Sequence, residues 1–554
     1  MINNKFLPFA LLALTQGAFA QQPPTSGGQM QQIPPAPAQE RPAPQIQLDR
    51  GAAPGIAAPD SARIMVNALR VTGAKAYSES QLLAVTGFKP GTQLTLAELR
   101  GMATRISDYY RANGYFIAQA YLPPQDIKDG IVEIAVLDGQ YGKVSLNNKT
   151  RLSDRIANNL LGGLNSGDPV MSDPLETRLL LLSDVPGVNV KSTLAPGSDV
   201  GTSDLLVDLT PGKSVTGSVD ADNAGNRYTG EYRLGATVNL NNPTGNGDVA
   251  SVRVLTSGSG LNYARASYQL QLGKARAGVA YSYLDYELGR EFASLRAHGT
   301  AKIASVFGTY PLIRSRNSNL YAQLAFDDRT FQDKVDSTSS VTDKKARVLM
   351  ASLYGDHRDR NFGGVTGYSV TLATGNLDIV TPGVAAADAA TAQTNGHYNK
   401  LSFGVTRAQA IVPTVSLHAA LSGQIASKNL DVSEKMGLGG MYGVRAFPQG
   451  EAYADQGYLL NLELRKRLTT SAEKLPGKVD LIAFVDTGTV TTNKSPWAAG
   501  SNSRTLSGAG IGVNWTGNDN LIVKAYYARK LGSETAISAP DESGRFWIQA
   551  IKFF

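Results

Sequence analysis

Short segments that alternate between apolar and polar residues fill the chain from residue 213 to its end. In one of them, Ala264, Ala266, Tyr268 and Leu270 form one face of a strand, and the polar residues between them form the other. The alternation recurs, less regularly, in the segments 232–240, 320–326, 460–464, 479–488, 509–515 and 521–527. Allowing about ten residues for each strand and about ten for each connection predicts about sixteen antiparallel strands in residues 213–554.

Helical spacing appears before residue 213, where the pattern predicts two small α+β domains of the order β-α-α-β-β. The elements of the first domain, residues 61–139, are a strand at 64–71, helices after Ser78 and Thr95, and strands at 116–122 and 131–137. Each helix begins with a capping box, Ser78 with Gln81 and Thr95 with Glu98. The second helix has one apolar face, and Asn113-Gly114 is its predicted stop.

The second domain, residues 140–212, repeats the same order of elements. Its predicted elements are a strand at 143–147, a helix after Ser153, a helix from Asp173, and strands at 188–194 and 205–209.

The N-terminal residues have the pattern of an export signal. Lys5, an apolar run over 6–14 and Ala18-Phe19-Ala20 predict a signal peptide over residues 1–20. Residues 21–60 are rich in proline and glutamine, and their prolines remove too many backbone donors for a stable helix. We therefore expect a flexible, partly extended linker there.

Composition and export together distinguish a membrane barrel from a soluble β-sandwich, which would alternate in the same way. Beyond the signal, the sequence has no run of about twenty apolar residues, so a helical membrane protein is disfavoured. Tyrosine, phenylalanine and tryptophan near the segment ends suit the interface girdles of an outer-membrane barrel. The net charge of +7 is spread along the chain and does not form a nucleic-acid-binding patch.

Enzyme chemistry is not indicated by the sequence. The four histidines, His298, His357, His397 and His418, are scattered without metal-ligand spacing, and no cysteine is present. Gly508, Gly510 and Gly512 alternate on one strand face, which favours packing over nucleotide binding. We expect no catalytic residue, no metal and no cofactor.

A glycine-rich segment, Leu438 to Gly450, carries the candidate mechanism. Counting hairpins back from Phe554, with both barrel ends in the periplasm, places residues 427–457 in an outer loop. In the strand 479–488 the apolar face is Val479, Leu481, Ala483 and Val485. Phe484, Asp486 and Gly488 therefore face the lumen.

A loop folded back into the pore would bring Arg445 to these lumen residues. Arg445 could then pair with Asp486, stack on Phe484 and pass over Gly488, which has no side chain. Glu463 and Arg465 on the preceding strand offer further partners. The alternatives are a surface arginine that contacts lipopolysaccharide and a solvated lumen carboxylate.

Several motifs in a fixed order resemble one family. Val444-Arg445-Ala446-Phe447, with Gly439, Gly440 and Gly450 around it, resembles the loop motif of two-partner secretion (TpsB-type) outer-membrane transporters, and Phe484-Val-Asp-Thr-Gly488 resembles their barrel-wall motif. Tyr310 to Arg316 resembles a barrel segment of the same family. In the first small domain, the residues similar to the family's polypeptide-transport-associated (POTRA) domain include Gly114, Tyr115, Leu122, Pro123 and Gln125.

This resemblance to haemolysin and filamentous-haemagglutinin exporters, of the BamA-like superfamily, implies a transmembrane antiparallel β-barrel behind two POTRA-like domains. It implies the outer membrane of a Gram-negative bacterium, with the N-terminal domains in the periplasm. The implied partner is a secreted exoprotein, a TpsA-like haemolysin or adhesin, captured unfolded and passed through the barrel. We also expect contact with lipid and lipopolysaccharide, no nucleic acid and a monomer.

Two rival functions stay open at this point. A BamA-like assembly factor would insert other barrels, and its depletion would remove many outer-membrane proteins. A passive porin would take up solutes without any cargo, and it would leave the periplasmic domains unexplained.

Two departures from the family pattern affect these expectations. Ala446 replaces the usual glycine, so the loop tip must accommodate a Cβ. The segment 21–60 matches poorly the plug helix that some relatives place in the pore, so a helical plug is not assumed and a plugging role for this segment stays open.

Overall fold

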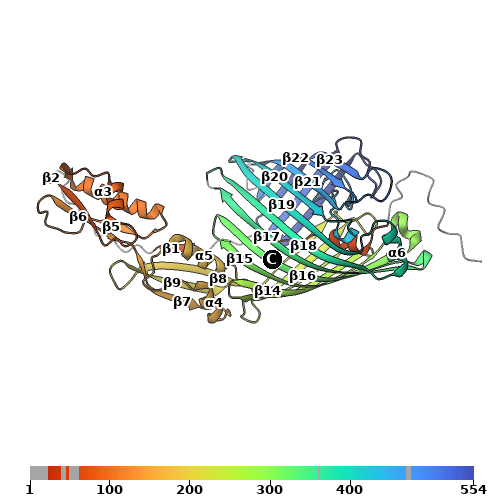
Figure 1. Ribbon diagram of the computed structural model, residues 1–554, viewed down its shortest axis with the longest axis horizontal. Helices are drawn as coiled ribbons and strands as arrows, with labels where there is room; N and C mark the ends of the chain where they lie inside the picture. Colours follow the sequence, from red (N-terminus) through yellow and green to blue (C-terminus); the bar gives the residue numbers. More distant parts are fainter. Residues whose placement is uncertain (1–22, 39–44, 49–61, 360, 469–475) are drawn as a thin grey trace, which may run out of the picture.

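Sixteen antiparallel strands form a closed barrel that makes up most of the molecule, with two small domains beyond one end (Figure 1). The computed structural model describes residues 23–38, 45–48, 62–359, 361–468 and 476–554. The barrel closes where β10 (Val215–Asp222) pairs with β25 (Gly544–Phe553). The expected fold class and strand number are confirmed. The predicted signal peptide, residues 1–20, lies outside the described residues.

The other barrel strands follow one another in sequence order around the wall. They are β11 (Arg233–Asn241), β12 (Val249–Thr256), β13 (Leu261–Leu272), β14 (Ala275–Glu287), β15 (Ala297–Arg314), β16 (Ser318–Val335), β17 (Ser340–Asp359), β18 (Gly364–Ile379), β19 (Gly396–Val412), β20 (Val415–Ala426), β21 (Gln456–Leu468), β22 (Lys478–Thr491), β23 (Ser503–Thr516) and β24 (Leu521–Lys530). Below, the inner end of the barrel is the end where β10 begins and β25 ends.

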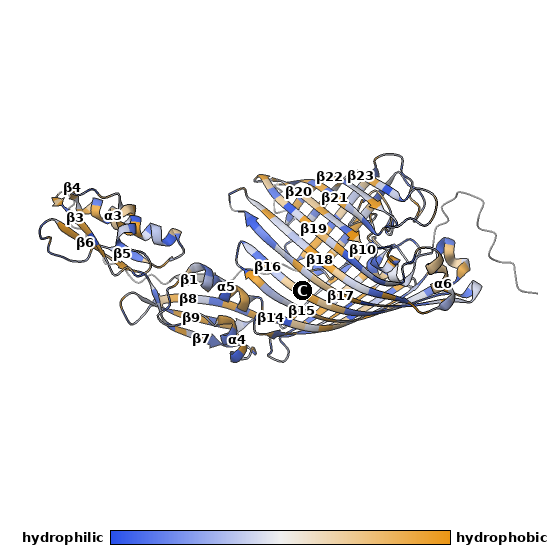
Figure 2. Ribbon diagram, in the orientation of Figure 1, coloured by the Kyte–Doolittle hydropathy of each residue, from blue (hydrophilic) through white to orange (hydrophobic). Residues whose placement is uncertain are grey.

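Apolar side chains alternate outward around the wall, and Figure 2 shows orange residues interspersed with blue and white ones along the barrel strands. On the adjacent strands β15 to β18, Val306, Phe326, Leu349 and Leu372 are all exposed. Such a belt suits the hydrocarbon core of a membrane, because these side chains have no protein partner to cover them. In the described part of the chain, no helix is long and apolar enough to cross a membrane.

The first small domain has its own apolar core. It contains β2 (Arg63–Val66), β3 (Ala68–Thr72), α2 (Glu79–Thr86), β4 (Thr92–Thr95), α3 (Leu96–Ala112), β5 (Gln119–Tyr121) and β6 (Ile131–Leu137). Both predicted capping boxes are present, and α3 ends at Asn113. The one strand expected over 64–71 is divided into β2 and β3, which belong to different sheets.

The second small domain packs two helices against a four-stranded sheet. Its elements are β7 (Gln140–Asn148), α4 (Asp154–Leu161), α5 (Ser172–Ser183), β8 (Val188–Pro196) and β9 (Thr202–Pro211). The order of elements is the predicted one. A strand from outside the domain, β1 (Gln45–Leu48), pairs in parallel with β8 and completes the sheet.

The proline-rich segment was expected to lack a helix, and this expectation was wrong for residues 26–31. They form α1 (Ser26–Gln31), which begins at Thr25, whose hydroxyl accepts a hydrogen bond from the Gly28 amide. The prolines lie outside these six residues, so they do not interrupt its backbone hydrogen bonds. The α1 helix contacts β14, β15 and β16 and the short 3-10 helix η3 (Val432–Glu434).

The second small domain docks on an inner turn of the barrel. The guanidinium of Arg314 donates from Nε and Nη2 to the carboxylate of Asp184, at 2.8 Å each. Arg316 forms an ion pair with Glu176 of α5 at 3.0 Å, and Thr177 donates to the Arg314 carbonyl. The motif segment ending at Arg316 thus joins the barrel to the small domain.

Candidate functional site: the arginine loop

The loop between β20 and β21 folds back into the barrel and brings its tip, residues 438–450, against the wall. We call these residues the arginine loop. Gly440 and Gly450 adopt positive φ angles of 113° and 83°, which favour glycine. At Gly439 a Cβ would lie 2.4 Å from the Pro448 carbonyl oxygen, so the two arms approach too closely for a side chain there.

Arg445 and Asp486 form the predicted ion pair, and both are buried. Arg445 donates from Nε to Oδ2 of Asp486 at 2.8 Å and from Nη2 to Oδ1 at 2.7 Å. The backbone amide of Arg445 also donates to Oδ2, at 3.1 Å. Asp486 is fully buried and Arg445 is 4% exposed. The alternative interpretations, a surface arginine and a solvated carboxylate, do not fit this arrangement.

The predicted additional partners, Glu463 and Arg465, join the same network from β21. Arg445 Nη1 donates to Oε1 of Glu463 at 2.7 Å, and Arg465 donates to Oε2 from Nε at 2.8 Å and from Nη2 at 2.6 Å. Asn461 donates to Asp486 at 2.8 Å and to the Gly443 carbonyl at 3.0 Å. Two carboxylates are thus shared by two guanidinium groups.

Aromatic rings cover the guanidinium of Arg445 on the wall side. Its Cζ lies 3.4 Å from the ring centroid of Phe484 and 5.1 Å from that of Tyr526. The two rings meet edge to face, with centroids 6.0 Å apart. A cation held over ring faces and away from water is stabilised by the electrostatic attraction of those faces. Phe484 therefore has the predicted stacking role in the geometry.

Trp547 on β25 is a further partner of the arginine loop that was not predicted from the sequence. Its indole Nε1 donates to the carbonyl oxygen of Arg445 at 2.7 Å, and the side chain is buried. A signal was available in the sequence, since the apolar neighbours Phe546 and Ile548 suit a lipid face, and alternation along the strand then turns Trp547 inward. The lumen-facing position of Asn461 could be inferred in the same way, because Asn461 lies two positions before Glu463 and residues two apart on a strand share a face.

Two wall glycines lie under the arginine loop, and the loop residue nearest Gly488 is not the expected Arg445. A Cβ at Gly488 would lie 2.8 Å from the Leu438 side chain, so Leu438 passes over Gly488. The residue next to Arg445, Ala446, lies over Gly508, where an added Cβ would be 2.5 Å from the Ala446 Cβ. Ala446 is absent from the residues with positive φ, so its Cβ is accommodated without backbone strain.

Apolar residues of the arginine loop seal it into the barrel. Val444 and Phe447 are fully buried and pack in one cluster with Ile482, Phe484 and Trp547. The alternation on β22 is otherwise as predicted, with Leu481 and Val485 exposed. Val479 differs: it was expected on the outer face, yet it is only 6% exposed, at the inner end of β22 between its cross-strand neighbours Leu468 and Trp515.

A second buried carboxylate, Glu451, fixes the outer side of the arginine loop. It accepts from Arg504 Nη1 at 2.6 Å, from the Ile537 amide at 3.1 Å and from the Ser538 amide at 2.8 Å. Glu451 is fully buried. It therefore joins the loop to the outer loop between β24 and β25. Glu451 was not predictable from the sequence, because its partners lie in loops distant in sequence.

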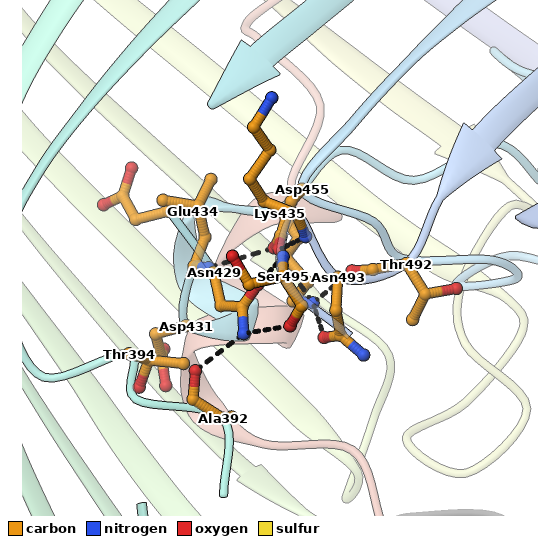
Figure 3. A network of polar contacts seen from close by, with 12 residues as sticks. Ala392, Thr394, Asn429, Asp431, Glu434, Lys435, Asp455, Thr492, Asn493 and Ser495 are labelled. Atoms are coloured by element: carbon orange, nitrogen blue, oxygen red, sulfur yellow. Dashed lines mark hydrogen bonds and ion pairs between the residues drawn. The ribbon is translucent and has the colours of Figure 1, made fainter. Parts of the chain in front are cut away.

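Polar contacts also hold the segment that leads into the arginine loop (Figure 3). Asn429 donates to the carbonyls of Ala392 and Ser495, at 2.8 Å each, and accepts from the Ser495 amide at 2.6 Å. Lys435 forms an ion pair with the buried Asp455 at 3.0 Å. These contacts connect three outer loops to one another.

The α1 helix lies beside this segment and is held at both ends. The Ser26 amide donates to Asp333 at 2.7 Å, and the Gln32 carbonyl accepts from Arg233 at 3.1 Å. Tyr453 accepts from the Gln32 side chain at 2.6 Å and donates to the Gly28 carbonyl at 3.2 Å. The helix is therefore bonded both to the wall and to the residues just beyond the arginine loop.

The motif residues of the first small domain have structural positions that fit their types. Gly114 follows the C-cap of α3 with a φ of 91°, and its carbonyl accepts from the Ser172 amide of the second domain at 2.9 Å. Tyr115 packs against Tyr110 in an aromatic cluster. Gln125 bonds to both backbone groups of Glu133, at 2.7 and 2.8 Å. Leu122 packs on the core, and the carbonyl of Pro123 accepts from Gln125 at 3.3 Å.

Comparison with known families decides what kind of protein has this architecture. Residues 201–515 match the family described as haemolysin secretion/activation protein ShlB/FhaC/HecB. Residues 64–139 match the ShlB-type POTRA domain. The chain belongs to this family. It is therefore an outer-membrane transporter of the two-partner secretion type, with its POTRA-type domain in the periplasm.

Individual relatives and solved structures agree with this assignment. The heme/hemopexin transporter protein HuxB of Haemophilus influenzae strain 86-028NP is 31% identical over 475 residues, which cover 84% of this chain and 82% of that protein. The outer membrane transporter CdiB of Dickeya dadantii is 24% identical over 435 residues, 76% of this chain and 74% of that one. The structure of CdiB from Escherichia coli has the same fold, with a TM-score of 0.68, 20% identity and coverage of 91% of this chain and 93% of that one.

A more distant structure shares the barrel architecture. BamA from Haemophilus ducreyi, lacking POTRA domains 1–3, gives a TM-score of 0.54 at 14% identity, over 88% of this chain and 100% of that one. Among the described residues, no group of three or more His, Cys, Asp or Glu side chains is placed to hold a metal ion.

Proposed function

We propose that this chain captures one unfolded exoprotein in the periplasm and passes it outward through its barrel, with the arginine loop holding the lumen in a closed, defined arrangement. Family membership supports the direction and class of transport. The observation that carries the proposed role of the loop is the buried Arg445 bound to Asp486 and Glu463.

The physical basis is the cost of breaking a buried ion pair. Removing Asp486 leaves the buried Arg445 with Glu463 as its remaining carboxylate partner, and breaking a buried ion pair in this way costs about 3–5 kcal/mol. A loop held this way has few intermediate positions, so it is either seated against β22 or displaced. Secretion starts from the seated arrangement, which gives the arriving exoprotein one defined set of lumen residues to meet, so weakening the ion pair lowers the fraction of molecules that can begin transport.

Capture would use the small domains, which present strands at sheet edges. An extended segment can add to such an edge through backbone hydrogen bonds, which makes recognition tolerant of sequence. No nucleotide-binding loop is present in the sequence, so we infer that folding of the exoprotein outside the cell draws it outward. Contact with lipopolysaccharide and a monomeric state are part of the proposal.

The test is Asp486→Asn, which keeps the shape of the side chain and removes its charge. We expect secretion of the exoprotein to fall at least about tenfold, since a loss of 1.4 kcal/mol or more already changes an equilibrium tenfold. Barrel abundance in the outer membrane, measured by heat-modifiable migration on gels, should stay nearly constant. The matched control is Asp480→Asn, at the inner end of the same strand, where Asp480 pairs with the half-exposed Arg467. Unchanged secretion by Asp486→Asn would contradict the role of the pair.

A further inference from the structure

A cavity of about 440 Å³ lies in the lumen against the arginine loop. Met441, Gly443 and Arg445 of the loop form one side of it. Strands β18 to β21 and β24 form the other side. The wall residues Arg465 and Lys524 lie near the inner ends of their strands, since β21 ends at Leu468 and β24 begins at Leu521. We call this space the lumen cavity, and it faces the side from which an exoprotein arrives.

Positive charge dominates the lining of the lumen cavity. Its cationic groups are Arg407, Arg445, Arg465 and Lys524, and the carboxylate among its lining residues is that of Glu463. Both oxygens of Glu463 are already occupied, Oε1 by Arg445 and Oε2 by Arg465. The cavity therefore lacks enough anionic groups to balance its cations.

Lys524 is the clearest unbalanced charge. Residues two positions apart on a strand share a face, so Lys524 lies on the lumen face of β24 with the buried Tyr526. Within the residues that the structure describes, its ammonium group makes no hydrogen bond or ion pair. Arg407 is better provided, because it donates to Thr366 at 2.8 Å and lies 3.8 Å from Asp359.

We propose that the lumen cavity binds an acidic segment of the unfolded exoprotein, with its carboxylates on Lys524 and Arg465. This inference rests on the proposed function and names the chemistry of its substrate. A carboxylate between these two cations would form charge-assisted hydrogen bonds in a space partly removed from water, where they are stronger than at an open surface. It would also compete with Glu463 for Arg465, and Glu463 in turn holds Arg445.

The test measures binding of a fluorescent hexaglutamate peptide to the purified full-length chain in detergent, by fluorescence anisotropy. We expect Lys524→Met to weaken binding about tenfold, because the variant loses the charge-assisted hydrogen bonds of the ammonium group. Lys524→Arg should restore it. Lys302→Met is the matched control: Lys302 is exposed on the outer wall, beside the buried Ala301. A hexalysine peptide should not bind the lumen cavity.

Three results would overturn the inference: equal hexaglutamate binding by the parent and Lys524→Met, an equal loss in Lys302→Met, or hexalysine binding of similar strength. The outcome is separate from that of the proposed function, because peptide binding requires no exoprotein and no transport. If the chain secretes its exoprotein but binds no hexaglutamate, the inference that the lumen cavity binds an acidic segment is wrong and the proposed function stands. If the chain binds the peptide but secretion continues when the chain is deleted, the proposed function is wrong.

Discussion

The guanidinium of Arg445 is buried deep in a barrel, and its environment compensates for the loss of water. Asp486 and Glu463 supply negative charge, and Phe484 supplies a ring face at 3.4 Å. The planar fork of arginine matches two oxygens of one carboxylate and still leaves Nη1 for another. Lysine presents a single ammonium and could not make this set of contacts, so the residue type at position 445 follows from the geometry.

Glu451 provides the first prediction at the residue scale. Glu451→Gln removes the charge that Arg504 and the amides of Ile537 and Ser538 bind, so we expect the outer loop around residue 537 to detach from the arginine loop. Breaking a buried charge pair costs about 3–5 kcal/mol, and the loop should then open more than about tenfold more often. Proteinase K added to intact cells measures this as faster cleavage in residues 531–543.

The control for Glu451 is Glu542→Gln in the same outer loop. The Glu542 side chain is 59% exposed and lies 3.9 Å from Arg545, so its removal should leave cleavage unchanged. Equal cleavage rates in parent and Glu451→Gln cells would mean that the buried carboxylate does not hold the loop.

Individual site residues were predictable where a motif and the alternation of faces along a strand indicated the same role. Asp486 and Phe484 follow from alternation on one strand, and Arg445 from a glycine-rich loop that is long enough to fold inward. Gly488 was expected to lie under Arg445, but Leu438 lies over it. The period of a strand predicts which face a residue is on, but it does not predict which loop residue packs against that face. The contact between Ala446 and Gly508 depends on the exact path of the loop, which local sequence does not determine.

At the scale of elements, the capping box of α3 makes a pH-dependent prediction. The carboxylate of Glu98 accepts from the Thr95 amide at 2.7 Å, and this bond lowers the pKa of Glu98. When the pKa of a carboxyl is lower in the folded state than in the unfolded state, where it is about 4.3 for glutamate, its charge stabilises the fold above the unfolded-state value. This stabilisation is lost as the pH falls through the pKa of the folded state. The Tm difference between a 62–212 fragment and its Glu98→Gln variant should therefore shrink from pH 6 to pH 3.

Glutamine can form the same capping box without titrating, so the other carboxylates of the fragment cancel in this comparison. The measurement is thermal unfolding followed by circular dichroism. A Tm difference that is constant over this pH range would show that the Glu98 carboxylate does not stabilise the start of α3.

The junction between α5 and the barrel makes another prediction. Asp184→Asn removes the charge that Arg314 binds through two nitrogens at 2.8 Å, and we expect the small domains to move more freely against the barrel. Spin labels on cysteines introduced at Asp154 and Asp519 measure this as a broader distance distribution, and the chain has no native cysteine to interfere.

Asp173→Asn is the control for the junction, since Asp173 lies on α5 but is exposed. Its distance distribution should match that of the parent chain. Identical distributions for the parent and Asp184→Asn would mean that the Arg314 contact does not fix the domain.

Elements were predictable from sequence where caps and periodicity coincide, as in α2 and α3. The α1 helix was missed because tertiary contacts hold it: it has six residues, too few to be stable alone, and it is bonded to Asp333 and Arg233 of the wall. Strand β1 was also missed as a distinct element, because its partner β8 is more than a hundred residues away.

For the whole molecule, the strand count followed from length and alternation, but register in residues 330–400 did not. Strands β16 to β19 are long, from 16 to 20 residues, and exceed the roughly ten that a membrane requires. Their outer parts, such as Lys345 and Arg347 on β17, carry exposed charges. Between these charges, Ala346 and Val348 are buried in an apolar cluster inside the barrel, so the apolar-outside, polar-inside pattern of the membrane belt does not continue there.

One measurement tests the central claim, that this chain is a dedicated exporter, most directly. Culture medium and outer-membrane protein content are compared in the native host with and without the chain. We expect one large protein to disappear from the medium while other barrels persist, because family, fold and site all indicate transport of a single exoprotein. A general loss of outer-membrane barrels, with no selective loss from the medium, would contradict this account and assign the chain to barrel assembly.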